Sequence, residues 1–196
     1  MNKRFRLPYK RYEDIKKIAS SKIKEWGIKS LPYNCFQLCK MLGIVLKKYS
    51  DQEQSVQKEL MEYSEDAFCY TIVENGCAVR VIAYNDKMPE HRIRFSIMHE
   101  IGHIVLDHTE HSQLAEAEAN FFAQYMLAPT PTLQYILPLA ASKVSFLYNI
   151  SEECAKNVIV QFKNWKEKGE PFLLPYEKTL LEHLHFIPAQ EVHSSI

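Results

Sequence analysis

The chain has 196 residues, of which 46% are hydrophobic and 24% charged, and this suits one domain with a modest appendage. That composition supplies a core without a disulfide or metal staple. Basic and acidic side chains both number 24, and the resulting zero net charge argues against a dedicated nucleic-acid binder. No segment approaches the roughly 20 apolar residues of a membrane span.

The cysteines indicate the compartment. They number five and include no Cys-x-x-Cys pair, so we expect structural thiols rather than a redox or metal pair. The basic amino terminus lacks the apolar stretch of a signal peptide. We therefore expect a cytoplasmic protein, since cysteines stay reduced there.

The amino-terminal third reads as two helices, a strand and a polar segment, over residues 11–26, 34–43, 44–46 and 51–65. Asn34 is a candidate N-cap for the second helix, and Gly43 is suited to end it. The polar segment predicts a loop or a loosely attached turn of helix.

A β-hairpin is the clearest signal further along the chain. Two β-prone runs, 68–73 and 77–84, flank Asn75 and Gly76, a pair that tolerates the positive φ of a tight turn.

Helical patterns then dominate to the end, over 90–107, 112–127, from Leu133 onward, from Ser151 to about Gly169, and around Leu180. Thr130-Pro131-Thr132 interrupts them and is the one credible internal boundary. We therefore expect a domain at residues 1–130 and a helical extension at 131–196 that packs on it.

The chemistry is concentrated in the helix predicted over 90–107. His99 and His103 stand four residues apart, so they share a helical face and can bind one metal ion. Glu100 follows the first histidine and can act as general base toward water activated by zinc. Chance alone places this motif in roughly three sequences per hundred, so the motif does not decide the function.

A catalytic zinc ion requires a third protein ligand. A histidine six residues after His103 is excluded, because Thr109 stands there. Glu110, Glu116 and Glu118 are the candidates. Glu116 and Glu118 point about 160° apart on a helical wheel, so only one of the two can bind easily. We favour Glu116, because Asn120 lies on the same face and can steady it.

Other polar side chains near the motif have weaker claims. We expect His108 and His111 to be surface residues. His91, Arg94 and Tyr84 could assist a tetrahedral oxyanion, but a structural or surface role is favoured for each.

Three sequence patterns together resemble the ImmA/IrrE metallopeptidases. The resemblance rests on RFSIMHEIGH at residues 94–103, on Glu116-x-x-Ala119-Asn120-x-Phe122-Ala123, and on Leu127-x-Pro129. The chain departs from the family pattern at Ser96, where threonine is usual, and at the Leu127-Ala128-Pro129 end; neither departure touches the metal motif.

The resemblance implies an α+β fold, a small zincin-like arrangement of helices on a short antiparallel sheet, with a helical C-terminal part. It implies zinc held by His99, His103 and Glu116, with Glu100 catalytic. It also implies an endopeptidase that relieves repression by cleaving a helix-turn-helix repressor, in bacteria or mobile elements.

Two alternatives stay open from the sequence. Residues 141–168 are loosely spaced like a helix-turn-helix and carry several lysines, so the protein could be a non-proteolytic, metal-binding regulator acting through protein or DNA contacts. The acidic pair Glu152-Glu153 and the neutral net charge make direct nucleic-acid binding the weaker reading. The second alternative is a zinc hydrolase with a small-molecule substrate.

Overall fold

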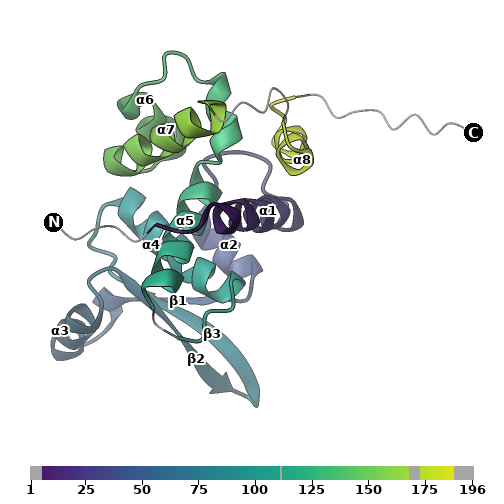
Figure 1. Ribbon diagram of the computed structural model, residues 1–196. Coiled ribbons are helices and arrows are strands. Elements are labelled where there is room, and N and C mark those ends of the chain that lie inside the picture. The colour runs from purple at the N-terminus through teal and green to yellow at the C-terminus, as the bar shows by residue number, and fades with distance from the viewer. Residues whose placement is uncertain (1–5, 111, 168–172, 188–196) are drawn as a thin grey trace, which may run out of the picture.

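The computed structural model describes residues 6–110, 112–167 and 173–187. This part of the chain is mostly helical and carries one small sheet (Figure 1). Its elements are α1 (Tyr9–Glu25), α2 (Cys35–Met41), β1 (Val45–Lys48), α3 (Gln54–Tyr63), β2 (Ala67–Glu74), β3 (Cys77–Tyr84), α4 (Glu90–Val105), α5 (Gln113–Leu127), α6 (Ala141–Tyr148), α7 (Glu152–Glu167) and α8 (Pro175–His183). The predicted α+β fold class is confirmed.

The three strands pair in the order β1-β3-β2. β2 and β3 form the predicted hairpin, and Asn75 and Gly76 have φ values of 50° and 77°, as a two-residue turn with both central residues at positive φ requires. The prediction of an antiparallel sheet is wrong for β1, which runs parallel to β3. A tight turn forces β2 and β3 to be antiparallel. The longer connection through α3 and β2 frees β1 to run parallel to β3.

Helices α4 and α5 form the centre of the molecule, where they pack against each other at close range. A Cβ atom added at Gly102 would lie 3.1 Å from the Phe122 ring and 3.2 Å from the Ala119 backbone, so only glycine fits without displacement. Ile97 and Ile101 on α4 are also fully buried. This close packing brings one face of α4 against the amino-terminal half of α5.

The smaller helices follow local signals. Asn34 caps α2 as predicted, because its side chain accepts hydrogen bonds from the backbone N–H groups of Phe36 and Gln37, at 2.9 and 3.1 Å. Helix α3 buries none of its residues, which agrees with the expected loose attachment of this polar segment.

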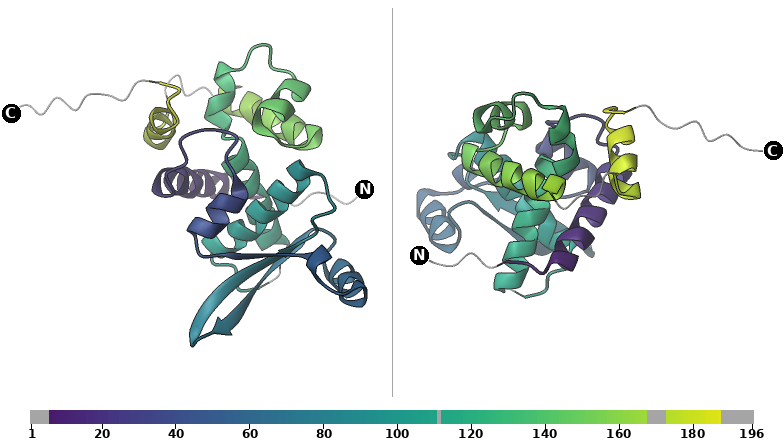
Figure 2. Two further views of the ribbon diagram at one scale, coloured as in Figure 1. Left: turned by 180° about the vertical axis from the view of Figure 1, so that it is seen from behind. Right: turned by 45° about the horizontal axis from the view of Figure 1, so that its top comes forward.

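The C-terminal helices cover one end of the molecule. α7 lies against α5, and α8 lies beside α1 (Figure 2). Ser151 caps α7 by accepting a hydrogen bond from the Cys154 N–H at 3.1 Å. The core is continuous across residue 130, since Val158 and Leu180 belong to the same apolar cluster as Ile97. The predicted end of α7 near Gly169 lies outside the described residues, as does part of the proposed extension.

In the described ranges, no helix combines the length and the hydropathy needed to cross a bilayer.

Candidate metal centre

Three side chains from two helices converge at the α4–α5 contact. The Nε2 atoms of His99 and His103 lie 3.0 Å apart. The Glu116 carboxylate comes from the first turn of α5, and its oxygens lie 3.3 Å from His99 Nε2 and 3.4 Å from His103 Nε2. Within the residues that the structure describes, these three form the one cluster with metal-ligand spacing.

The donor set fits a tetrahedral metal ion. Zinc bonds of about 2.0–2.1 Å at tetrahedral angles place neighbouring donor atoms about 3.3 Å apart, close to the three separations observed. Two imidazole nitrogens and one carboxylate are a donor set that zinc accepts, and three protein ligands leave the fourth position open. His99, His103 and Glu116 could therefore hold such an ion without rearrangement of the backbone.

Glu100 lines the cavity in front of this cluster, a space of about 750 Å³. The pKa of its carboxyl is raised to about 7, chiefly by burial and also by the neighbouring Glu116, while His99 acts in the opposite direction. A hydrogen bond from the backbone N–H of Cys69 on β2 also lowers it. A carboxyl with its pKa near neutrality is suited to accept and return a proton.

Glu118 lies on the other side of α5 and is buried. Both of its oxygens accept hydrogen bonds from Arg11 on α1, at 2.6 Å each. The hydrogen bond from Arg11 holds the pKa of Glu118 below its usual value, and His108 acts in the same direction.

A family comparison decides the identity. Residues 39–159 match the peptidase family model described as the IrrE N-terminal-like domain. The match includes the whole sheet and both helices of the cluster, and it covers more than half of the chain. The chain belongs to this metallopeptidase family. No curated protein matches the sequence.

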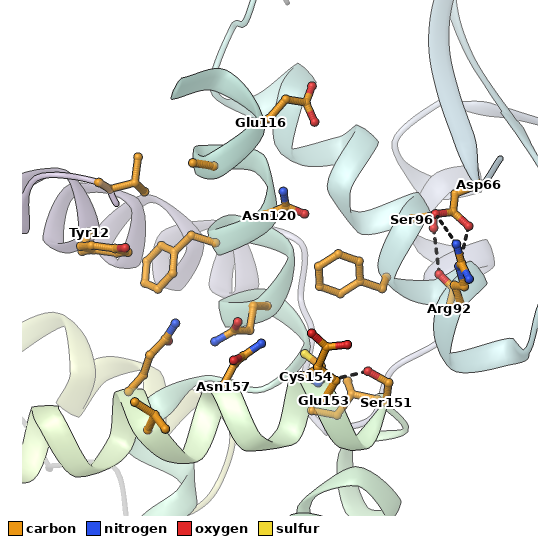
Figure 3. A pocket seen from close by; sticks show the side chains of 18 of the residues that line it. Tyr12, Asp66, Arg92, Ser96, Glu116, Asn120, Ser151, Glu153, Cys154 and Asn157 are labelled. Atoms are coloured by element: carbon orange, nitrogen blue, oxygen red, sulfur yellow. Dashed lines mark hydrogen bonds and ion pairs between the residues drawn. The ribbon is translucent and has the colours of Figure 1, made fainter. Parts of the chain in front are cut away.

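The peptidase carries a larger groove beside the three converging side chains. Its volume is about 1430 Å³, and it shares Glu116, Asn120 and Phe95 with the smaller cavity. Figure 3 shows the groove between α5 and α7, with Glu116 at one end and Asn157 on the opposite helix. Pockets for drug-sized ligands usually measure about 300–1,000 Å³, so this groove is larger than a typical small-molecule pocket.

Carboxamides line this groove from both helices. Asn120 and Gln124 stand four residues apart on α5, and Asn157 and Gln161 stand four apart on α7. Spacing of four places each pair on one helical face. Carboxamides donate and accept hydrogen bonds, which matches the alternating N–H and C=O groups of a polypeptide backbone.

The structure places the remaining predicted residues as follows. Glu110 lines the smaller cavity but is not among the three converging donors. Tyr84 is buried in the core, and Arg94 is buried with its Nη1 donating to the Tyr33 carbonyl at 2.5 Å, so both have structural roles. His91 lines the larger groove. His111 lies outside the described residues.

His108 is the residue that sequence reasoning missed. Its side chain is only 11% exposed, and its ring contacts His103 and Glu118, so the prediction of a surface residue is wrong. The chain turns back there because Asp107 adopts a φ of 55°, which lets the His108 N–H bond to the His103 carbonyl at 3.0 Å. The spacing of five from His103 was the available signal, since a reversal after the helix end returns that residue to the last turn.

Proposed function

We propose that this metallopeptidase is a zinc-dependent endopeptidase in which His99, His103 and Glu116 hold zinc and Glu100 is the catalytic residue. The observation that carries the proposal is the convergence of the three donor side chains, with Glu100 lining the cavity in front of them and a larger groove adjoining that cavity. Zinc, when bound, supplies Lewis acidity that activates water and polarises the scissile carbonyl at neutral pH.

Glu100 handles the proton in this mechanism. Its carboxylate takes the proton from the attacking water and passes it to the leaving amine, so one group serves as base and then as acid. In the metal-free protein, burial favours the protonated form of this carboxyl, whereas a bound cation favours the carboxylate that acts as the base.

The edge of the sheet supports an extended substrate. β2 pairs with β3 alone among the described strands, so its other edge carries no strand. The Cys69 backbone N–H is directed at Glu100, which places that edge at the site. A substrate segment that adds to this edge would present a backbone carbonyl to the site formed by His99, His103 and Glu116. The β2 edge and the groove between α5 and α7 together give a substrate chain two directions in which to extend from the site, as an endopeptidase requires.

We further propose that the substrate is a regulatory protein, a helix-turn-helix repressor, and that the protein acts in the cytoplasm. Membership of the family supports a protein substrate. The five cysteines are all free, which supports a reducing compartment.

We also propose the division into a peptidase domain at 1–130 and a helical extension at 131–196. In this scheme α7 forms one wall of the groove, and its lysines at 156, 163 and 166 are exposed to solvent.

Metal analysis combined with a cleavage assay tests the proposal. Wild type and Glu110→Ala should each bind about one zinc per chain, and Glu116→Ala should lose it. Glu110 is the matched control, because it is an exposed glutamate that lines the same cavity. Glu100→Gln should bind zinc normally but cleave a degenerate peptide library about 10²–10⁴-fold more slowly.

The repressor assignment needs its own test. Purified helix-turn-helix repressors from the same genome would be incubated with zinc-loaded wild type or Glu100→Gln and analysed by mass spectrometry. Cleavage at one site by wild type alone is the expected result. Zinc binding with no cleavage of either peptides or repressors would favour the non-proteolytic regulator instead.

A further inference from the structure

A row of polar side chains leads from the cluster of His99, His103 and Glu116 to helix α1. His103 Nδ1 lies 3.0 Å from His108 Nδ1, and His108 Nε2 lies 2.9 Å from a Glu118 oxygen. Arg11 donates two hydrogen bonds to the Glu118 carboxylate, from Nε to Oε1 and from Nη2 to Oε2, at 2.6 Å each. The row therefore joins α1, α5 and the turn after α4 to one of the proposed zinc ligands.

When both imidazoles are neutral and His103 holds zinc through Nε2, the protons in this row have one arrangement. The ionised Glu118 carboxylate can only accept, so the His108 Nε2–H donates to it. In a neutral imidazole the other nitrogen is then an acceptor, and His108 Nδ1 accepts from His103 Nδ1–H. That leaves the lone pair of His103 on Nε2, the atom that faces His99 and Glu116.

The other histidine of the cluster lacks such support. His99 Nδ1 is buried and has no hydrogen-bond partner among the described residues. Metal-binding histidines usually donate their second ring N–H to a carboxylate, a carbonyl or water, and this fixes tautomer and orientation. His103 is thus the imidazole of the pair whose orientation the protein determines.

The position of each partner is built into the fold. Glu116 and Glu118 point in different directions from the same turn of α5, so one helix supplies both the proposed ligand and the relay carboxylate. Arg11 is brought to Glu118 by the packing of α1 on α5, where the Tyr12 and Phe121 rings meet edge to face at 4.7 Å. Asp107, at positive φ, returns His108 toward His103.

We propose that His108, Glu118 and Arg11 form a positioning relay that fixes the tautomer and ring orientation of His103 and thereby sets the affinity of the site for zinc. This inference rests on the proposed function, since it requires His103 to bind zinc. The competing account is that the same residues only attach α1 to α5 and to the turn after α4. In that case their loss lowers stability but leaves zinc affinity as it was.

The test measures zinc affinity by competition with a chromophoric chelator, together with the visible spectrum of the cobalt(II)-substituted protein. His108→Phe keeps the ring volume but removes both nitrogens. His108→Asn places an oxygen close to the position of Nδ1, so it can still accept from His103. Glu118→Gln removes the charge with little change in shape and serves if His108→Phe does not fold. His183→Phe is the matched control, because His183 is partly buried on α8 and contacts Lys29 instead of the site.

The relay predicts that His108→Phe and Glu118→Gln each weaken zinc binding by about 10- to 100-fold and alter the cobalt spectrum. His108→Asn should recover part of the lost zinc affinity. The double variant His108→Phe/Glu118→Gln should bind zinc only slightly more weakly than either single variant, since the two residues act through one another. His183→Phe should bind zinc like wild type. Unfolding of each metal-free variant in urea gives the stability effect separately.

Three results would overturn the relay. Zinc affinity within twofold of wild type in both His108→Phe and Glu118→Gln would leave only the attachment role. Equal losses in His108→Phe, His108→Asn and His183→Phe would indicate a general effect of destabilisation. If wild type itself binds no zinc, the proposed function fails and the relay fails with it, a result that the variants alone would not produce.

Discussion

The partly buried carboxyl of Glu100 should lower the stability of the metal-free protein at neutral and alkaline pH. Its pKa rises from 4.5 to about 7 in the folded state, so the folded protein binds more protons than the unfolded chain between those values. The free energy of unfolding therefore falls as the pH rises from about 4.5 to about 7, and it levels off above that range.

Replacing Glu100 by glutamine removes the ionisation but keeps an oxygen for the Cys69 N–H. A pKa difference from 4.5 to about 7 corresponds to about 3 kcal/mol, so Glu100→Gln should gain at most that much at pH 8. At pH 5 wild-type Glu100 is mostly protonated in the folded state, and the gain should fall below about 1 kcal/mol. The gain at pH 8 corresponds to a melting temperature higher by roughly 6–12 °C for a protein of this size.

Urea unfolding at pH 5 and pH 8, in the presence of a chelator, measures this difference. The chelator is needed because a bound cation would stabilise the Glu100 anion and remove the effect. Glu110→Gln, the same change at an exposed position, should stay within about 0.5 kcal/mol of wild type at both values. A Glu100→Gln variant whose stability relative to wild type is the same at pH 5 and pH 8 would refute the reasoning.

Three further perturbations have defined outcomes. Gly102→Ala should lower the free energy of unfolding by about 1–3 kcal/mol, because the new methyl group meets Phe122 and the α5 backbone. It should also weaken zinc binding by moving α5. A stability gain of about 1 kcal/mol in urea unfolding, as helix propensity alone predicts, would contradict the close packing. Asn34→Ala removes the cap of α2 and should cost about 1 kcal/mol, with zinc affinity measured by chelator competition unchanged. Free zinc at 100 times its dissociation constant should stabilise wild type by about 2.7 kcal/mol in thermal unfolding, but not Glu116→Ala, and an equal shift in both would place the ion elsewhere.

Features that depend on near neighbours along the chain were predictable before the fold was known. The spacing of His99 and His103 sets them on one helical face wherever that helix lies, because the α-helical period is a local property. Asn75 and Gly76 specify the hairpin for the same reason, since positive φ is a property of those residues. The choice of Glu116 over Glu118 also rested on helical geometry, and the structure brings Glu116 to the two histidines.

Features that depend on contacts between distant parts of the chain could not be predicted from local patterns. The parallel pairing of β1 with β3 and the groove wall formed by α7 arise from packing between segments far apart in sequence. Arg11 and Glu118 are separated by 107 positions, and no local pattern links them. His108 looked like a surface residue because helix periodicity ends before it. Only the reversal at Asp107 and the approach of α1 to α5 bury it between His103 and Glu118, where its two ring nitrogens acquire partners.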